Sequence, residues 1–122
     1  MLFVDDHRVL AESLALCIEL EPDMTCAGCL HTADHLAEEV EKLRPDVVLL
    51  DLMMPGKEPL EALREVKGTR VIVFSGRDDQ ETLASAAAAG ASGFLSKGAE
   101  ILVMLEAIRA VAREDAAFRV WK

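Results

Sequence analysis

The chain has 122 residues, 52% of them hydrophobic, and a formal net charge of -9 at pH 7, which fits one compact domain with its own core. The excess of acidic side chains argues against a domain that grips a phosphate backbone by itself, because that contact needs clustered Lys and Arg. No apolar run approaches the length of a membrane span and no signal-peptide pattern opens the chain, so we expect a cytoplasmic protein without a membrane segment.

Five short apolar segments with strand character alternate along the chain with five segments of helical periodicity. Leu10, Leu14 and Ile18 recur on one face of the first helical segment, as in an amphipathic helix. Pro59 suits the first position of the third helix, and Gly90 suits the end of the fourth. The predicted strands are 1–4, 24–29, 47–51, 71–74 and 93–96, and the predicted helices are 8–20, 33–44 with Thr32 as its cap, 59–66, 80–89 and 100–113.

This alternation predicts an α/β fold with a doubly wound parallel sheet of five strands and five helices. Each parallel crossover needs a helix and keeps one hand, so helices cover both faces of the sheet. We expect residues 1–114 to form this one domain. The stretch 115–122 fits no predicted element, although it contains Val120 and Trp121. We therefore expect it to be a tail, or the start of a linker to an output domain that is absent from the chain.

The segment 47–51 ends in a carboxylate at the place where open α/β sheets carry their chemistry. Its four apolar residues predict a strand buried on both faces. Asp51 follows at the carboxyl end of this strand, shortly before a turn at Pro55. Taken alone, Asp51 has two interpretations of equal weight, because aspartate is also common where strands end. The ends of the other strands decide between them.

The carboxyl ends of four predicted strands carry three carboxylates, a hydroxyl and an ammonium group. These groups belong to Asp5, Asp6, Asp51, Ser75 and Lys97. In a parallel sheet such ends share one edge, and crowded carboxylates repel each other unless a cation lies among them. Mg²⁺ is an ion that a few carboxylates and water hold well. A carboxylate nucleophile, Mg²⁺ and a lysine together indicate phosphoryl transfer. Turn chemistry explains any one of these residues, but not all of them at successive strand ends.

The cysteines and two of the histidines are not expected to form a site. Cys26 and Cys29 form a C-x-x-C pair, but no second pair completes a zinc site. Three cysteines without an extracellular context indicate reduced thiols. His31 and His35 stand one helical turn apart with no third ligand nearby. We interpret both as solvent-exposed residues of a helix.

These residues make the chain resemble the receiver domain of bacterial two-component response regulators over essentially its whole length. The opening at 4–7, Val-Asp-Asp-His, and the segment 90–97, Gly-Ala-Ser-Gly-Phe-Leu-Ser-Lys, are most similar to the NarL/FixJ (LuxR-type) subfamily. The resemblance implies a flavodoxin-like strand order, 2-1-3-4-5, and a switch that catalyses only its own phosphorylation and dephosphorylation. It also implies that Asp51 accepts a phosphoryl group from a sensor histidine kinase.

The resemblance further implies how the pocket holds Mg²⁺ and protects the phosphoryl group. Asp6 and Asp51 bind the ion directly in this scheme, and Asp5 binds it through water. The backbone carbonyl of Met53 completes the protein ligands. Met53 and Arg77 occupy positions where the family controls the access of water to the phosphoryl group. A long apolar side chain and a long cation there are expected to slow hydrolysis.

Three residues in or directly after the last two predicted strands complete the resemblance. Ser75 corresponds to the residue that hydrogen-bonds one phosphoryl oxygen, and Lys97 to the residue that pairs with another. Phe94 matches the aromatic switch of the family, which turns inward when the serine moves toward the phosphoryl group; an ordinary core aromatic is the alternative. Gly98 stands where the family commonly has a proline after a cis bond. We expect a trans bond here, because a cis bond is costly without proline.

Two other functions compete with this interpretation. A phosphatase of the haloacid-dehalogenase kind needs a second carboxylate two residues after its aspartate, and this chain has Met53 there. A pseudo-receiver, which is an interaction module that works without phosphorylation, usually loses part of the acidic pocket that this chain retains. Members of the subfamily carry a DNA-binding domain after the receiver. We therefore expect DNA contact only through such a domain, and a homodimer on phosphorylation.

Overall fold

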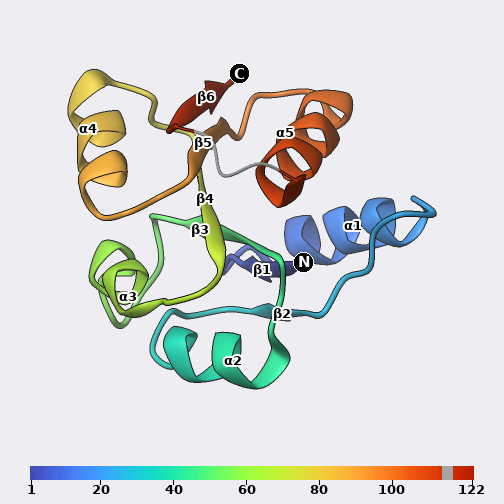
Figure 1. Ribbon diagram of the computed structural model, residues 1–122, viewed down its shortest axis with the longest axis horizontal. Coiled ribbons are helices and arrows are strands. Elements are labelled where there is room, and N and C mark those ends of the chain that lie inside the picture. The colour runs from blue at the N-terminus through green and yellow to red at the C-terminus, as the bar shows by residue number, and fades with distance from the viewer. Residues whose placement is uncertain (114–116) are drawn as a thin grey trace.

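Six parallel strands form one sheet in the order β2-β1-β3-β4-β5-β6 in the computed structural model, which describes residues 1–113 and 117–122 (Figure 1). The strands are β1 (Leu2–Val4), β2 (Gly28–Leu30), β3 (Val47–Asp51), β4 (Arg70–Ser75), β5 (Gly93–Ser96) and β6 (Arg119–Trp121). The helices are α1 (Arg8–Glu19), α2 (Leu36–Leu43), α3 (Pro59–Glu65), α4 (Gln80–Ala88) and α5 (Ile101–Arg113). Every helix of the described chain is too short or too polar to cross a membrane.

The prediction of a five-stranded sheet is wrong in number, although the order of the first five strands and the five helices agree with expectation. The sixth strand is Arg119–Trp121, which lies in the stretch that fitted no predicted element. Three residues carry too little periodicity to identify a strand. This one forms because β5 offers a free edge for pairing, and that edge depends on the tertiary fold rather than on the local sequence.

The central strand β3 is buried on both faces because helices cover both sides of the sheet (Figure 1). Val48 and Leu50 point into a core shared with α2, α3 and α4. Val47 and Leu49 point into a second core that α5 and Ile18 of α1 complete. Each face therefore takes alternate residues of one continuous apolar run, which leaves Asp51 as the first polar side chain at its end.

Helix starts follow the sequence signals at α3 and α4 but not at α2. The carboxylates of Glu58 and Asp79 accept hydrogen bonds from Glu61 N and Thr82 N and cap α3 and α4. Thr32 does not cap α2, which is a wrong prediction: α2 begins at Leu36, and the hydroxyl of Thr32 accepts a bond from Asp34 N at 3.4 Å instead.

The strand predicted at 24–29 is shorter and shifted, since β2 starts only at Gly28. The residues before it are held by the amino-terminus of the chain. Ala27 N donates to Met1 O at 2.7 Å, and the Met1 ammonium group donates to Thr25 O at 2.8 Å. Because β2 runs on to Leu30, the residues after it form a connection rather than a helix.

An ion pair fastens α5 to the connection between α1 and β2. Arg109 donates to both carboxylate oxygens of Asp23, at 2.9 Å and 2.8 Å, and these bonds lower the pKa of Asp23 from 3.8 to about 2. Because the pKa of Asp23 is lower in the folded protein than in the unfolded chain, the ion pair stabilises the fold above pH 3.8, and this stabilisation is lost as the pH falls toward 2.

We expect wild type to resist urea better than Asp23→Asn at pH 5, and the difference in stability between the two proteins to disappear near pH 2. A gap that stays constant with pH would contradict this.

Candidate functional site

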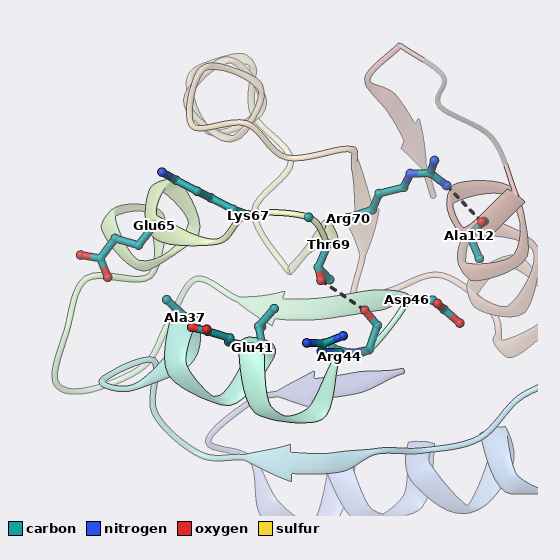
Figure 2. A pocket seen from close by; sticks show the side chains of 12 residues that line it. Ala37, Glu41, Arg44, Asp46, Glu65, Lys67, Thr69, Arg70 and Ala112 are labelled. Carbon is teal, nitrogen blue, oxygen red and sulfur yellow. Dashed lines mark hydrogen bonds between the residues drawn. The ribbon is translucent and has the colours of Figure 1, made fainter.

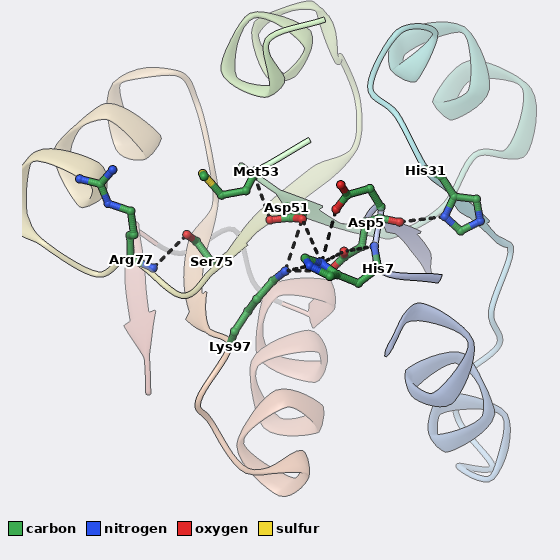
Figure 3. Close-up of polar contacts among 9 residues, drawn as sticks. Asp5, His7, His31, Asp51, Met53, Ser75, Arg77 and Lys97 are labelled. Carbon is green, nitrogen blue, oxygen red and sulfur yellow. Dashed lines mark hydrogen bonds and ion pairs between the residues drawn. The ribbon is translucent and has the colours of Figure 1, made fainter. Parts of the chain in front are cut away.

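The carboxyl edge of the sheet gathers the polar groups that end its strands (Figure 3). Asp5 and Asp6 directly follow β1, and Asp51 and Ser75 end β3 and β4. Lys97 follows β5, and its side chain extends back over the edge toward Asp51 (Figure 3). Parallel pairing of β1, β3, β4 and β5 brings these residues to one place although up to 92 positions separate them along the chain.

Lys97 bridges two buried carboxylates. Its ammonium nitrogen lies 3.2 Å from Asp5 Oδ2 and 3.3 Å from Asp51 Oδ2. Asp5 is 2% exposed and Asp51 is 1% exposed. Among the described residues, neither of these two oxygens has a well-formed hydrogen-bond partner. One ammonium group therefore faces two carboxylates in a place with little access to water, and this leaves the pocket short of positive charge.

The two carboxylates respond differently to this environment. Burial raises the pKa of Asp51 above its ordinary value, and the negative charge of Asp5 raises it further. A hydrogen bond from Met53 N and the positive charge of Lys97 lower this pKa, but they do not cancel the rise. Burial also acts to raise the pKa of Asp5, but hydrogen bonds from His7 and the nearby Lys97 outweigh it, so its pKa lies below the ordinary value. The ionised form is therefore less favoured for Asp51 than for Asp5, as expected for a buried carboxylate that shares one ammonium group with a second carboxylate.

His7 belongs to this cluster, and the sequence analysis gave it no role. Its ring nitrogen Nδ1 lies 2.9 Å from Asp5 Oδ1, 3.4 Å from Asp6 Oδ1 and 3.9 Å from Asp51 Oδ2. Its backbone N donates to Asp5 Oδ1 at 2.8 Å. The available signal was its position, since a histidine directly after two carboxylates at a strand end cannot be far from them.

His31 contacts the backbone of Asp5 beside the cluster. The prediction that His31 is an exposed residue of a helix is wrong. It lies in the connection after β2, is only partly exposed, and its Nδ1 lies 2.8 Å from the backbone oxygen of Asp5. This contact, together with the bond from Asp5 N to Leu30 O at 2.9 Å, fixes the chain where it leaves β1. The three cysteines are free, and burial raises the pKa of the Cys29 thiol to about 11, so it is not a reactive thiolate.

The cluster fits a divalent cation that prefers oxygen ligands. Ligand atoms of Asp5, Asp6, His7 and Asp51 all lie within 4.8 Å of one another. A second indication is that, among the described residues, the two buried oxygens have only the ammonium group of Lys97 between them, because two buried carboxylates are costly to keep ionised with a single counter-charge. Three carboxylates are the donor set that suits Mg²⁺. The residues present therefore fit the ion that the sequence predicts.

The other predicted residues lie around this cluster or apart from it. Met53 N donates to Asp51 Oδ1 at 3.1 Å, and the Met53 side chain is largely exposed. Ser75 is buried, and its hydroxyl accepts a bond from Arg77 N at 3.1 Å. Phe94 is fully buried in the apolar core shared with α2, α3 and α4. The expected trans bond between Lys97 and Gly98 is confirmed, because no cis bond occurs in the described chain.

A hollow of the described surface lies away from this cluster, at the opposite end of the strands (Figure 2). It measures about 640 Å³, and its lining includes Arg44, Asp46, Lys67 and Arg70. Asp46 immediately precedes β3, whereas Asp51 ends it, so the length of the strand separates the two places. The lining mixes both signs of charge and holds no converging set of ligands.

Comparison with known proteins assigns the same kind of domain. A family model described as response regulator receiver domain matches residues 1–109. The nitrate/nitrite response regulator protein NarL of Escherichia coli (strain K12) is 34% identical over 116 residues, which cover 92% of this chain and 54% of that protein. The chain spans about half the length of the curated relatives it matches.

Solved structures show the same fold. The signal receiver domain of the response regulator NarL from Mycobacterium tuberculosis superposes with a TM-score of 0.85 at 27% identity, covering 92% of this chain and 94% of that one. The BeF3-activated receiver domain of RstA from Klebsiella pneumoniae gives a TM-score of 0.83 at 25% identity, covering 93% and 97%. The residues at the strand ends, the order of the strands and the similarity to known proteins thus all indicate the same kind of domain.

Proposed function

The chain belongs to the response regulator receiver domain family, and from that premise we propose that Asp51 accepts a phosphoryl group from a sensor histidine kinase with Mg²⁺ in the acidic pocket. The domain is a signalling module of two-component systems, related to regulators of the NarL type. The observation that carries the proposal is the pair of buried carboxylates, Asp5 and Asp51, bridged by Lys97. A phosphorylation-independent module has no use for this costly arrangement of charges.

Each residue of the pocket has a task in phosphoryl transfer. A carboxylate oxygen of Asp51 attacks phosphorus, forming an acyl phosphate while the bond to the donor nitrogen breaks and the donor imidazole leaves with the electron pair. Lys97 lies where it can neutralise a phosphoryl oxygen, and the Ser75 hydroxyl is free to donate because Arg77 N uses it only as an acceptor. Asp6, Asp51 and the backbone carbonyl of Met53, with Asp5 through water, would hold Mg²⁺, which would supply further charge neutralisation.

A small phosphodonor tests this function without the kinase. We expect the chain incubated with phosphoramidate and Mg²⁺ to gain the mass of one phosphoryl group, because the receiver supplies the positioning and charge neutralisation that the reaction needs. Intact-protein mass spectrometry is the measurement, and an EDTA-treated sample is the control. A folded chain that gains no mass with Mg²⁺ would overturn the proposal and favour the pseudo-receiver alternative.

Arg77 and Met53 are proposed to set the lifetime of the phosphoryl group. Both side chains are exposed beside the pocket, and Arg77 Nε lies 3.6 Å from Asp79 Oδ1. We expect Arg77→Ala to shorten the half-life of the acyl phosphate several-fold, because removal of the long side chain gives water easier access. The decay of the phosphorylated mass after removal of the donor measures it. Equal half-lives for the variant and wild type would contradict this role.

The output and its partners follow from the family rather than from this chain. The relatives are transcriptional regulators, and their length beyond the matched half leaves room for a further domain. We propose that contact with DNA is made by such a domain, that residues 1–114 are the receiver proper, and that phosphorylation favours a homodimer. Location in the cytoplasm is proposed on the family relation alone.

A further inference from the structure

The outer edge of β5 is occupied by the chain's own carboxyl-terminal strand. Strand β6 pairs with β5 in parallel, with Phe94 opposite Val120 and Leu95 opposite Trp121. It lies at the end of the sheet, between α4 and α5 (Figure 1). A strand of three residues makes few ladder hydrogen bonds, so its side chains must provide most of what holds it in place.

The anchor of this strand is Trp121, which fits a space left by a missing side chain. The indole is 6% exposed and belongs to the core on the α5 side of the sheet. A Cβ atom on Gly93 would lie 2.6 Å from Trp121 Cζ3 and 3.0 Å from the carbonyl oxygen of Arg119. Only glycine at position 93 therefore admits the ring. The guanidinium of Arg119 covers the ring from outside, 4.9 Å from its centroid.

Within the described part of the chain, the docked strand leaves one polar group of its anchor without a hydrogen bond. Among the described residues the indole nitrogen of Trp121 is buried without a hydrogen-bond partner. An unpaired buried N–H group loses its bond to water and gains nothing in return, which offsets part of the apolar burial of the ring. A short edge strand held by one such anchor is expected to exchange between docked and undocked states.

Two contacts connect this strand to the phosphorylation pocket. Val120 and Phe118 pack against the core that contains Phe94, which stands three residues before Lys97. On the other side, Lys122 Nζ lies 3.2 Å from Asp78 Oδ2, in the loop that follows Ser75. The two segments that carry Lys97 and Ser75 are also joined directly, because Lys97 N donates to Ser75 O at 2.9 Å.

We propose that the outer edge of β5 is a regulated docking site for residues 119–121, and that docking of this strand and phosphorylation of Asp51 favour each other. The inference rests on the proposed function. In this structure β6 is docked while the bond from Lys97 N to Ser75 O joins the ends of β5 and β4. A phosphoryl group contacted by both Lys97 and Ser75 would hold the same two ends together. Linkage requires the reverse effect as well: a docked strand must raise the affinity of the pocket for a phosphoryl group.

The chain contains a single tryptophan, so Trp121 reports the docked state directly. Acrylamide quenching of its fluorescence is measured with Mg²⁺, before and after addition of beryllofluoride, and bound beryllofluoride is detected separately by fluorine NMR. We expect quenching to fall when beryllofluoride binds wild type, and to stay unchanged in Asp51→Asn, which cannot bind it. Quenching that stays constant or rises on binding would overturn the coupling.

The reciprocal arm uses Gly93→Ala, which fills the space of the indole without altering the reporter. We expect this variant to be quenched more strongly and to bind beryllofluoride about fivefold more weakly, at the low end of couplings between sites. Val120→Asp gives a second route to undocking. Gly98→Ala is the matched control, because a Cβ there meets no atom closer than 3.7 Å.

The outcomes separate the coupling from the function beneath it. If beryllofluoride binds wild type and Gly93→Ala equally, β6 is not coupled to the pocket, and the proposed function stands. If fluorine NMR detects no beryllofluoride on folded wild type, the proposed function fails and the coupling fails with it. Circular dichroism of each variant establishes that it is folded before either conclusion is drawn.

Discussion

Replacement of Asp51 by asparagine is expected to abolish phosphorylation completely. The amide has no anionic oxygen with which to attack phosphorus, and no neighbouring carboxylate occupies its position at the end of β3. Asp5 is equally buried, but its oxygens are engaged by His7 and Lys97 and its pKa is depressed, so it stays a charged neighbour rather than a substitute nucleophile. Intact mass after treatment with phosphoramidate and Mg²⁺ should show no phosphoryl adduct in Asp51→Asn.

A matched control is available at the other end of the same strand. Asp46 directly precedes β3, is exposed and lies beside the hollow of Figure 2. Asp46→Asn removes the same charge from the chain and should be phosphorylated as fast as wild type. Peptide mapping of the wild-type adduct should locate it at Asp51. An adduct of full stoichiometry on Asp51→Asn would show that another side chain is the acceptor.

Removal of the ammonium group of Lys97 is expected to destabilise the domain more than any surface substitution. In Lys97→Met, Asp5 and Asp51 stay buried without a counter-charge, a situation that costs about 3 kcal/mol when one partner of a buried ion pair is lost. Mg²⁺ should restore much of this stability, because it binds the folded state only. Urea unfolding at pH 7, with EDTA and with Mg²⁺, measures both effects.

Two variants show whether the loss comes from charge in the pocket. Lys57→Met removes an ammonium group that pairs with Glu65 on the surface, and an exposed pair of this kind contributes about 0–1 kcal/mol. The double variant Lys97→Met with Asp51→Asn carries one fewer buried charge and should be more stable than Lys97→Met alone. If the double variant is no more stable, the effect of Lys97 comes from packing of its stem and not from its charge.

The local sequence predicts contacts correctly where the periodicity of a segment decides which way its side chains point. The apolar run that ends at Asp51 has to be buried on both faces, and parallel strands have to end at one edge. Those two rules predict that Asp5, Asp51 and Lys97 lie close together, and the ion pairs of Lys97 agree with this prediction. Their roles in catalysis stay predictions, since geometry alone does not test them.

The errors share one physical origin, which is contact between segments that are distant in sequence. Trp121 belongs to a strand only because Gly93, far from it along the chain, leaves room for its ring. His31 contacts Asp5 because β2 runs parallel to β1 and ends beside it. Thr32 has the chemistry of a helix cap, but the strand before it ends at Leu30, one residue later than predicted, and the helix starts only at Leu36. None of these contacts leaves a periodic trace in the local sequence.

The sixth strand also has a consequence for how the molecule behaves in solution. The terminal strand of a sheet presents unpaired amide and carbonyl groups that can recruit the same edge of another molecule. In this chain β5 carries apolar Phe94 and Leu95 and would be a poor outermost strand. Strand β6 replaces it with a shorter one that carries exposed Arg119, a charge that resists such stacking. A protein shortened before residue 119 would lose this protection and be prone to self-association through its sheet.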